Sequence, residues 1–181
     1  MRSDAAQRDE SASRVGQLVI RQASVADTKL IVSMLIEAAK WVEQLDGTIM
    51  WVEGELEEQR IRADVAEGMF VVAEIDSQAV GTMRLQLEDH LFWPDLEGGD
   101  SAFVHRLAVR RDFAGQGVST ALLDWAVDRA HALGKRFLRL DCDAERGRLR
   151  DFYERFGFRL HSYRQVGSYY VSRYELQIPQ P

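Results

Sequence analysis

A turn between a predicted strand and a predicted helix is the stretch of this sequence best suited to chemistry. Two glycines, Gly115 and Gly117, lie between an apolar segment that ends at Val109 and an amphipathic segment that begins at Val118. Glycine lets the backbone approach an anion without obstruction from a Cβ atom, and a helix N-terminus offers unpaired N–H groups and the positive end of its dipole. The spacing predicts a pyrophosphate site over residues 114–120. A purely structural tight turn is the alternative for this motif alone.

The turn differs from two common phosphate-binding motifs. A P-loop places a lysine and then a serine or threonine directly after its last glycine, whereas Val118 and Ser119 follow Gly117 here. The dinucleotide-binding fingerprint needs a third glycine at a position that Thr120 occupies. The turn by itself therefore indicates an anion site without naming the ligand.

Alternating strand and helix patterns surround the turn. Apolar and β-branched runs predict strands over 18–21, 69–75, 79–87, 101–109, 137–141, 158–164 and 169–178. Apolar residues spaced by three and four predict helices from Ser24 to Gly47 and over 53–66, 118–133 and 149–156. This order predicts a single-domain α/β (α+β) fold, with a mixed, twisted sheet of about six to seven strands and helices on both faces. The strands that flank the 118–133 helix should run parallel.

Side-chain patterns predict which faces of these elements are buried. Ser24 and Asp27 have the spacing of a capping box at the start of the first helix. The positions of that helix that should pack on a core are Ile31, Met34, Leu35, Ala38, Trp41, Val42 and Leu45. The inward positions expected in the second helix are Leu56, Ile61 and Val65. In the loop 88–100, Phe92 and Trp93 form either a lip around a substrate site or a plug at the edge of the core.

Composition excludes several classes of protein. The 181 residues are 46% hydrophobic and 29% charged, which is typical of a globular domain, here expected at 17–181 after a mobile polar tail at 1–16. With 23 basic and 29 acidic residues the net charge is −6, which disfavours nucleic acid as a partner. The sequence has no apolar run of about 18 residues and no apolar secretion signal at its start, so we expect no membrane span and a cytoplasmic location. Cys142 is the sole cysteine, which excludes an intramolecular disulfide and a cysteine-based zinc cluster.

Separated motifs, taken together and in order, resemble one known family. They are His105 to Val109, Gly115-Gln116-Gly117, Ala121-Leu122-Leu123 and Asp151 to Phe158. These segments resemble the GCN5-related N-acetyltransferase (GNAT) family, and the likeness in element order runs from Leu18 to Ile178. The resemblance implies that acetyl-CoA is the co-substrate without a metal, and that its pyrophosphate lies on the 114–120 turn. The pantetheine arm is expected to pair with the backbone near Val109 like an added strand.

The resemblance also implies a set of cofactor contacts and three catalytic positions. The contacts are Leu107, Ala108, Val109, Ala114, Gly115, Gln116, Gly117, Val118, Ser119, Thr120, Arg146 and Tyr153. Tyr153 matches the general acid of the family, since a phenol with a reference pKa of about 10 stays protonated at neutral pH and can donate to a thiolate. The backbone N–H of Leu107 is the implied oxyanion donor. His105 stands where the similar arylalkylamine N-acetyltransferases carry a histidine that acts as base through water, a role that suits the reference pKa of imidazole, about 6.5.

Structural alternatives exist for each of these side chains. Tyr153 also continues the apolar stripe of its helix, and His105 also fits a partly buried strand position. The alternative bases are Glu74, Asp141 and Asp143, which lie near predicted strand ends.

Three positions depart from the family pattern. Ala114 replaces the usual Arg or Gln, Ser119 replaces the usual Gly or Ala, and Arg146 stands where many members place an Asn that touches the cofactor arm. Backbone amides bind phosphate without those side chains, so we expect weaker or rearranged cofactor contacts, for which Arg111 or Arg146 could compensate.

The sequence therefore predicts acetyl transfer from acetyl-CoA to a primary amine by direct attack in a ternary complex. The expected partner is a small-molecule amine, and a homodimer is compatible with the family because its final strands often mediate dimers. One alternative is a non-catalytic acyl-CoA binding or sensing module. Another is a protein N-terminal or lysine acetyltransferase, which an extended peptide groove beside loop 88–100 would favour over a closed aromatic pocket.

Overall fold

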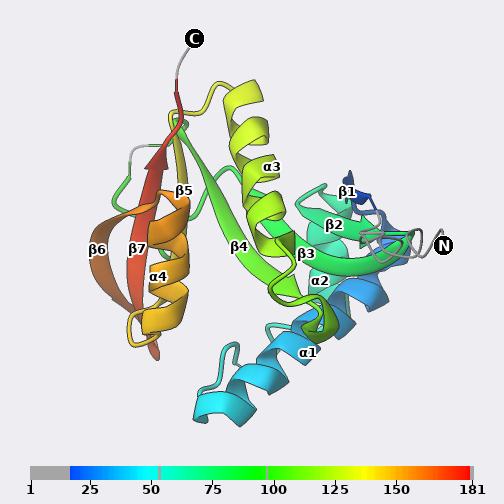
Figure 1. Ribbon diagram of the computed structural model, residues 1–181. Coiled ribbons are helices and arrows are strands. Elements are labelled where there is room, and N and C mark those ends of the chain that lie inside the picture. The colour runs from blue at the N-terminus through cyan, green and yellow to red at the C-terminus, as the bar shows by residue number, and fades with distance from the viewer. Residues whose placement is uncertain (1–16, 53, 97, 180–181) are drawn as a thin grey trace, which may run out of the picture.

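The computed structural model describes residues 17–52, 54–96 and 98–179, which form one mixed sheet with helices on both of its faces (Figure 1). The strands are β1 (Leu18–Gln22), β2 (Phe70–Ile75), β3 (Gln78–Gln86), β4 (Ser101–Val109), β5 (Phe137–Asp143), β6 (Arg159–Val166) and β7 (Tyr169–Gln177). The helices are α1 (Thr28–Asp46), α2 (Glu58–Ala66), α3 (Val118–Ala132) and α4 (Gly147–Phe156), with short 3-10 turns at Val25–Asp27 and Arg111–Phe113. The strand order β1-β2-β3-β4-β5-β7-β6 confirms the predicted fold class.

The sheet forks between β4 and β5. These two strands run parallel and pair from Ser101 opposite Phe137 to Val104 opposite Leu140, and the other recorded strand pairs of the described chain are antiparallel. Beyond Val104 the two strands diverge, as Figure 1 shows, because β4 continues along β3 and β5 continues along β7. The divergence leaves facing backbone edges without a partner strand in the described chain, which is where an added strand can bind.

Two apolar layers cover the sheet. One contains buried residues of α3 and α4, including Leu122 and Tyr153, and the other contains buried residues of α1 and α2, including Leu35 and Ile61. The start of α3 packs tightly on β3, since a Cβ added to Gly81 would lie 2.9 Å from Val118 Cγ1. This close packing fixes the N-terminus of α3 beside the fork.

The first helix confirms most of its predicted pattern. The capping box of Ser24 and Asp27 is present, and Gly47 ends α1 in a left-handed conformation with φ 73°. Five of the predicted core positions are buried, but Trp41 and Leu45 are exposed by 37% and 56%, so the prediction that they pack on the core is wrong. Both lie in the second half of α1, where Trp41 instead covers the guanidinium group of Arg111 at 3.8 Å.

The second helix is shorter than predicted. It begins at Glu58 rather than at residue 53, because Gly54 adopts a left-handed φ of 85° and residues 54–56 form turns. Ile61 and Val65 are buried, and Leu56 packs against the same core from the preceding turn, so the predicted inward face is confirmed.

The loop 88–100 divides its two aromatic residues between the two predicted roles. Trp93 is 2% exposed and plugs the core, whereas Phe92 is half-buried and lines a cavity of about 1070 Å³. Before this loop, the strands predicted over 69–75 and 79–87 form an antiparallel hairpin, with Asp76 and Ser77 as a two-residue turn at positive φ. The predicted tail at 1–16 lies outside the described residues. In the part of the chain that the structure describes, no helix is both long enough and apolar enough to cross a membrane.

Candidate active site

The fork between β4 and β5 opens into a cavity of about 1070 Å³. Its walls come from β4, β5 and α4, from the segment between α1 and α2, from the loop after β3 and from the turn between β6 and β7. The ionisable side chains that dominate its lining are Glu55, Asp89, His105, Arg106, Asp141 and Tyr153. The predicted acid and the predicted base therefore face one shared space.

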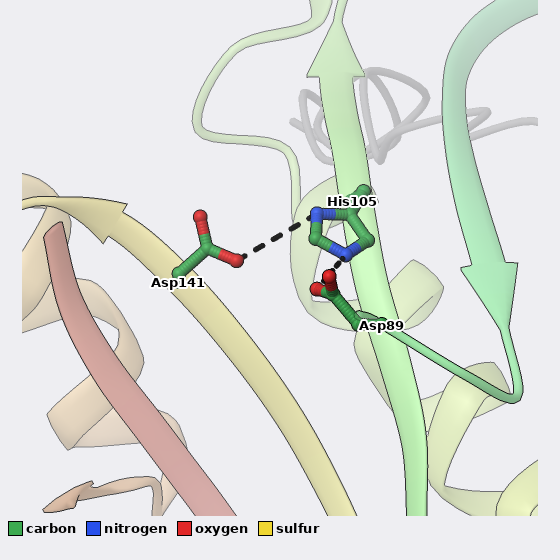
Figure 2. Close-up of side chains that lie close together, drawn as sticks. All are labelled: Asp89, His105 and Asp141. Atoms are coloured by element: carbon green, nitrogen blue, oxygen red, sulfur yellow. Dashed lines mark hydrogen bonds and ion pairs between the residues drawn. The ribbon is translucent and has the colours of Figure 1, made fainter. Parts of the chain in front are cut away.

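His105 lies between two carboxylates that come from different elements (Figure 2). Its Nε2 lies 2.9 Å from Oδ2 of Asp89, and its Nδ1 lies 3.7 Å from Oδ1 of Asp141. Asp89 is itself fixed, because its Oδ1 accepts hydrogen bonds from the backbone N–H groups of Leu91 and Phe92 at 3.1 and 2.9 Å. In the neutral imidazole, a hydrogen bond donated to Asp89 places the proton on Nε2. The Nδ1 lone pair then faces the side of the fork that carries Asp141.

The two carboxyl groups beside His105 titrate differently. Burial opposes ionisation of Asp89, but the hydrogen bond and charge of His105 and two backbone N–H groups outweigh burial and lower the pKa of this carboxyl. Burial raises the pKa of Asp141 to about 6, partly offset by His105 and reinforced by the charge of Asp89. Oδ1 of Asp141 receives no such hydrogen bond from the part of the chain that the structure describes, whereas Asp89 accepts two from its neighbours. The cluster thus contains one firmly ionised carboxylate and one that titrates close to neutral pH.

Tyr153 lies on α4 and packs in the core while lining the cavity. Its ring contacts Phe152 and Phe158 at centroid distances of 5.3 and 5.9 Å. Burial is the main cause that raises the pKa of its hydroxyl far above the ordinary value, and electrostatic repulsion from Cys142 and Asp141 adds to it. No hydrogen bond to this hydroxyl is recorded among the described residues, so its O–H is available to a group in the cavity. Tyr153 therefore packs in the core as the apolar stripe predicts, and it also lines the cavity; its role as the acid stays a prediction.

A bulge interrupts β4 directly after His105. Ala108 pairs with Thr82 and His105 pairs with Arg84, so Arg106 and Leu107 together lie opposite a single residue of β3. A bulge leaves one residue outside the ladder and redirects side chains. Arg106 has a left-handed φ of 55°, which is rare for a residue with a side chain. His105 and Arg106 consequently line the same cavity, although neighbouring side chains of a strand normally point to opposite faces.

Arg106 forms the centre of a second polar group in the cavity. Its side chain is 9% exposed, its Nη2 donates to Oε1 of Glu55 at 3.2 Å, and its guanidinium carbon lies 5.1 Å from the ring centre of Trp51. The other oxygen of Glu55 accepts the hydroxyl hydrogen bond of Tyr169. Burial and this hydrogen bond raise the pKa of Tyr169 to about 12. The carboxylate of Glu55 is therefore shared between a cation and a phenol.

A smaller cavity of about 330 Å³ lies over the glycine turn. Gly115 and Gly117 have left-handed φ values of 77° and 81°, and a Cβ atom on either would meet nothing within 4 Å. Gly117 is the N-cap residue of α3, and no described side chain caps this helix end. The first N–H groups of α3 are therefore free to bind an anion, and the open space over the glycines fits a phosphate group.

The two cavities are neighbours. Ser119 and Phe152 line both of them. Of the other predicted cofactor contacts, those that line the larger cavity are Leu107, Arg146 and Tyr153, and those that line the smaller are Val109, Gly115, Gly117, Val118 and Thr120. Ala114 and Gln116 belong to the turn without lining either cavity, and Ala108 packs into the core on the side of α1.

Arg146 and Arg111 have different surroundings. The side chain of Arg146 is 13% exposed, lines the larger cavity, and has no hydrogen-bond partner for Nε or Nη2 among the described residues. Its recorded ion pair, with Asp143, is long at 3.9 Å. Arg111 instead stacks on Trp41. Of the two arginines, Arg146 lines the larger cavity and Arg111 lines neither.

The alternative bases also separate. Glu74 pairs with Arg21 on the far side of the sheet and does not line the cavity, whereas Asp141 and Asp143 do. Sequence reasoning missed Asp89 and Arg106. The turn-forming pattern that follows Asp89 predicts its hydrogen bonds to its own loop but not its contact with His105.

Comparisons with known proteins agree with this geometry. The profile of the Acetyltransferase (GNAT) family matches residues 36–158. The uncharacterized N-acetyltransferase YesJ of Bacillus subtilis is 34% identical over 139 residues, covering 73% of this chain and 76% of YesJ. The structure of the PaiA N-acetyltransferase of Thermoplasma acidophilum in complex with coenzyme A superposes with a TM-score of 0.71 at 17% identity, covering 88% of this chain and 99% of that one. The structure of the ribosomal-protein-S18-alanine N-acetyltransferase of Escherichia coli superposes with a TM-score of 0.68 at 17% identity, covering 91% of this chain and 96% of that one.

The two solved structures share the fold with this chain at low sequence identity, so they support the architecture alone. The family match covers well over half of the chain, and the curated relative extends the likeness through most of its own length. On these grounds, the chain belongs to the GNAT family and is an N-acetyltransferase.

Proposed function

We propose that this protein transfers an acetyl group from acetyl-CoA to a primary amine by direct attack within a ternary complex. One observation carries the proposal: His105, Tyr153 and the β4 bulge at Leu107 border one cavity, which shares the lining residues Ser119 and Phe152 with the cavity over the glycine turn. Acetyl-CoA supplies the activated thioester, and GNAT enzymes use this co-substrate.

The chain offers a binding path for the cofactor at three points. The N–H groups at the start of α3 and the open space over Gly115 and Gly117 suit the pyrophosphate. The diverging edges of β4 and β5 suit the pantetheine arm, which pairs with backbone groups near Val109 as an added strand. Arg146, with two unpaired guanidinium nitrogens beside this path, holds the arm in place of the Asn found in many members of the family.

His105 removes the proton of the attacking amine. The hydrogen bond to Asp89 holds the proton on Nε2, which leaves the Nδ1 lone pair to accept a proton from the acceptor, directly or through one water. The charge of Asp89 stabilises the imidazolium that forms. Asp89 is thus a positioning residue, and His105 is the group that exchanges the proton.

The β4 bulge and Tyr153 stabilise the two negative charges of the reaction, which are the oxyanion on the acetyl carbonyl and the leaving thiolate. The backbone N–H of Leu107 donates to the oxyanion that develops on the acetyl carbonyl, a type of interaction worth about 3 kcal/mol when it is preorganised. The amine nitrogen bonds to the carbonyl carbon, the carbon–sulfur bond breaks, and the thiolate takes its proton from the Tyr153 hydroxyl. Because burial raises the pKa of Tyr153, this hydroxyl remains protonated at neutral pH.

The aromatic walls favour a small amine over a peptide. The ring centroid of Phe92 lies 6.1 Å from that of His105 and 6.2 Å from that of Tyr169. The ring of Trp51 lies 5.1 Å from the guanidinium carbon of Arg106. These rings line the cavity next to the base. A protein acceptor, as in the ribosomal-protein acetyltransferase of similar fold, requires an extended groove that this wall would interrupt.

A Tyr153→Phe variant tests the proposal. An enzyme that uses this acid is expected to lose about 10²- to 10⁴-fold in kcat with amines, measured by free-thiol release, while its calorimetric affinity for CoA changes less than about twofold. The matched control is Tyr163→Phe on the exposed face of β6, which should leave both quantities unchanged. Unchanged turnover in Tyr153→Phe would remove the assigned acid. A wild-type protein that binds CoA but acetylates no amine is the binding module instead.

A further inference from the structure

The most unusual residue of the cavity is Arg106. It combines a left-handed backbone, a side chain that is 9% exposed, and a buried Nη1 with no hydrogen-bond partner among the described residues. A strained backbone of this kind costs on the order of 1 kcal/mol and persists where its surroundings enforce it, often at functional sites. An unpaired buried guanidinium nitrogen adds a further cost. Both costs are borne by a residue that lines the cavity next to the proposed base.

The surroundings of Arg106 leave room for an anion. Its recorded carboxylate partner is Glu55, and Glu55 is already shared with the hydroxyl of Tyr169. Burial lowers the pKa of Arg106, and the charge of Glu55 only partly opposes this. The nearby guanidinium groups of Arg84 and Arg60 lower it further. Two like charges and one shared opposite charge therefore surround this cation, which is a setting that a second carboxylate would improve.

A second polar group in the same cavity has the opposite sign. Asp89 and Asp141 flank His105 there, and Oδ1 of Asp141 has no hydrogen-bond partner among the described residues within the usual limits. Because His105 and Arg106 are consecutive, the two polar groups start about 3.8 Å apart at their Cα atoms. The cavity thus contains two carboxyl groups beside the base and a buried guanidinium group at the next residue, Arg106.

We infer that the acceptor amine carries a carboxylate, as a free amino acid does, with its ammonium group on the Asp141 side of His105 and its carboxylate on Arg106. This inference rests on the proposed acetyl transfer and specifies its substrate class. The carboxylate pairs with the guanidinium at Nη1 while Glu55 keeps Nη2. The unpaired Nη1 is buried, so the guanidinium group shifts toward the cavity when the acceptor binds. Its hydrogen bond to Glu55 permits this shift, because a distance of 3.2 Å is at the long end of the normal range. The rings of Trp51, Phe92 and Tyr169 then contact the apolar part of the acceptor.

The test compares each standard L-amino acid with its own carboxamide as acceptor, by free-thiol release and product mass. The wild type is expected to show a kcat/KM roughly tenfold to hundredfold higher for the best free acid than for its amide, the range of one charge-assisted hydrogen-bond pair. Arg106→Gln should raise KM for the acid by a similar factor and leave the amide within about twofold. Arg106→Lys should restore part of the preference, and Arg129→Gln, on the exposed face of α3, should keep all of it.

Several results would overturn the inference. Equal use of acid and amide by the wild type would do so without any variant, and so would an Arg106→Gln variant that loses both acceptors equally while its melting temperature is unchanged. If amines are acetylated without a preference for acids, the proposed function stands and only the substrate class fails. If no amine is acetylated, calorimetric titration of the same acids and amides into the CoA-saturated protein decides the carboxylate site alone. Binding of the acid that Arg106→Gln abolishes supports it, and equal binding of acid and amide refutes it.

Discussion

At the scale of single residues, the site depends on a histidine held between two unequal carboxylates. Asp89, His105 and Asp141 come from a loop and two strands. One carboxylate oxygen of each aspartate and one imidazole nitrogen of His105 lie within 4.8 Å of one another. Asp89 is locked by hydrogen bonds and Asp141 is not, so the imidazole has one fixed side and one side open to chemistry. This asymmetry leads to two predictions.

Asp89→Asn should impair turnover without emptying the cofactor site. The amide oxygen of asparagine can still accept from Leu91 and Phe92, but its NH₂ group donates to Nε2 of His105 and moves the imidazole proton to Nδ1. The base atom is then occupied. We expect kcat to fall about tenfold to hundredfold with little change in KM for acetyl-CoA, measured by thiol release. The exposed Asp128→Asn on α3 serves as control, and a fall in cofactor affinity equal to the fall in kcat would contradict the assigned role.

Asp141 should make stability depend on pH in an unusual direction for a carboxyl group. Its folded-state pKa of about 6 lies above the ordinary 3.8, so the folded protein binds this proton more tightly than the unfolded chain. Its contribution to stability is therefore complete below about pH 4 and is lost as pH rises through 6. Relative to Asp141→Asn, the wild type should lose about 1 kcal/mol of unfolding free energy between pH 5 and pH 8, measured in urea. A constant difference across this range would show that burial does not shift this group, and exposed Asp124→Asn should give that constant difference.

The sequence identified part of this cluster. His105 and Tyr153 could be identified from the sequence because they fall within or beside recognisable motifs. Asp141 could be identified because it ends the strand predicted over 137–141. Asp89 and Arg106 were not, because their roles depend on tertiary contacts and on a backbone bulge. No residue pattern in a single strand predicts that Arg106 turns to the same side as His105.

At the scale of elements, the glycine turn and α3 carry the anion site. Gly117 caps the helix in a left-handed conformation, and its missing side chain leaves open space. The turn and the helix follow directly from the sequence, because glycine spacing and helical periodicity are local signals. The start of α2 was predicted less well. Acidic and apolar residues favour a helix from residue 53, but Gly54 adopts a left-handed conformation and the helix begins only at Glu58.

Gly117→Ala should weaken both the fold and cofactor binding. A left-handed φ costs an alanine about 1–2 kcal/mol, and no neighbouring atom lies within 4 Å of the new Cβ, so strain in the backbone rather than a steric clash is the cause. We expect this loss in urea unfolding and a CoA affinity reduced by roughly tenfold, because the anion-binding N–H groups move with the backbone. Gly98→Ala is the matched control, since a Cβ there also meets open space but no left-handed φ is involved. Equal effects of the two variants would argue against a role for the turn geometry.

At the scale of the whole molecule, the forked sheet brings these parts together. Residues from both cores and from several connecting segments line the cavity where β4 and β5 separate, a divergence that Figure 1 shows. The mixed sheet and its parallel pair could be predicted from element order, because the helix between β4 and β5 allows a parallel connection, whereas the exchange of β6 and β7 in the strand order was not predicted. The depth and lining of the cavity could not, since they depend on where loops such as 88–100 return to the sheet.

The central claim is direct transfer between two substrates bound at once, and initial-rate kinetics test it most directly. Thiol release is measured while acetyl-CoA and the best amine are both varied, and the protein mass is recorded after incubation with acetyl-CoA alone. Direct attack predicts intersecting double-reciprocal lines and an unmodified protein, in keeping with Cys142, whose pKa burial raises to about 12. Parallel lines together with an acetylated protein would contradict the account.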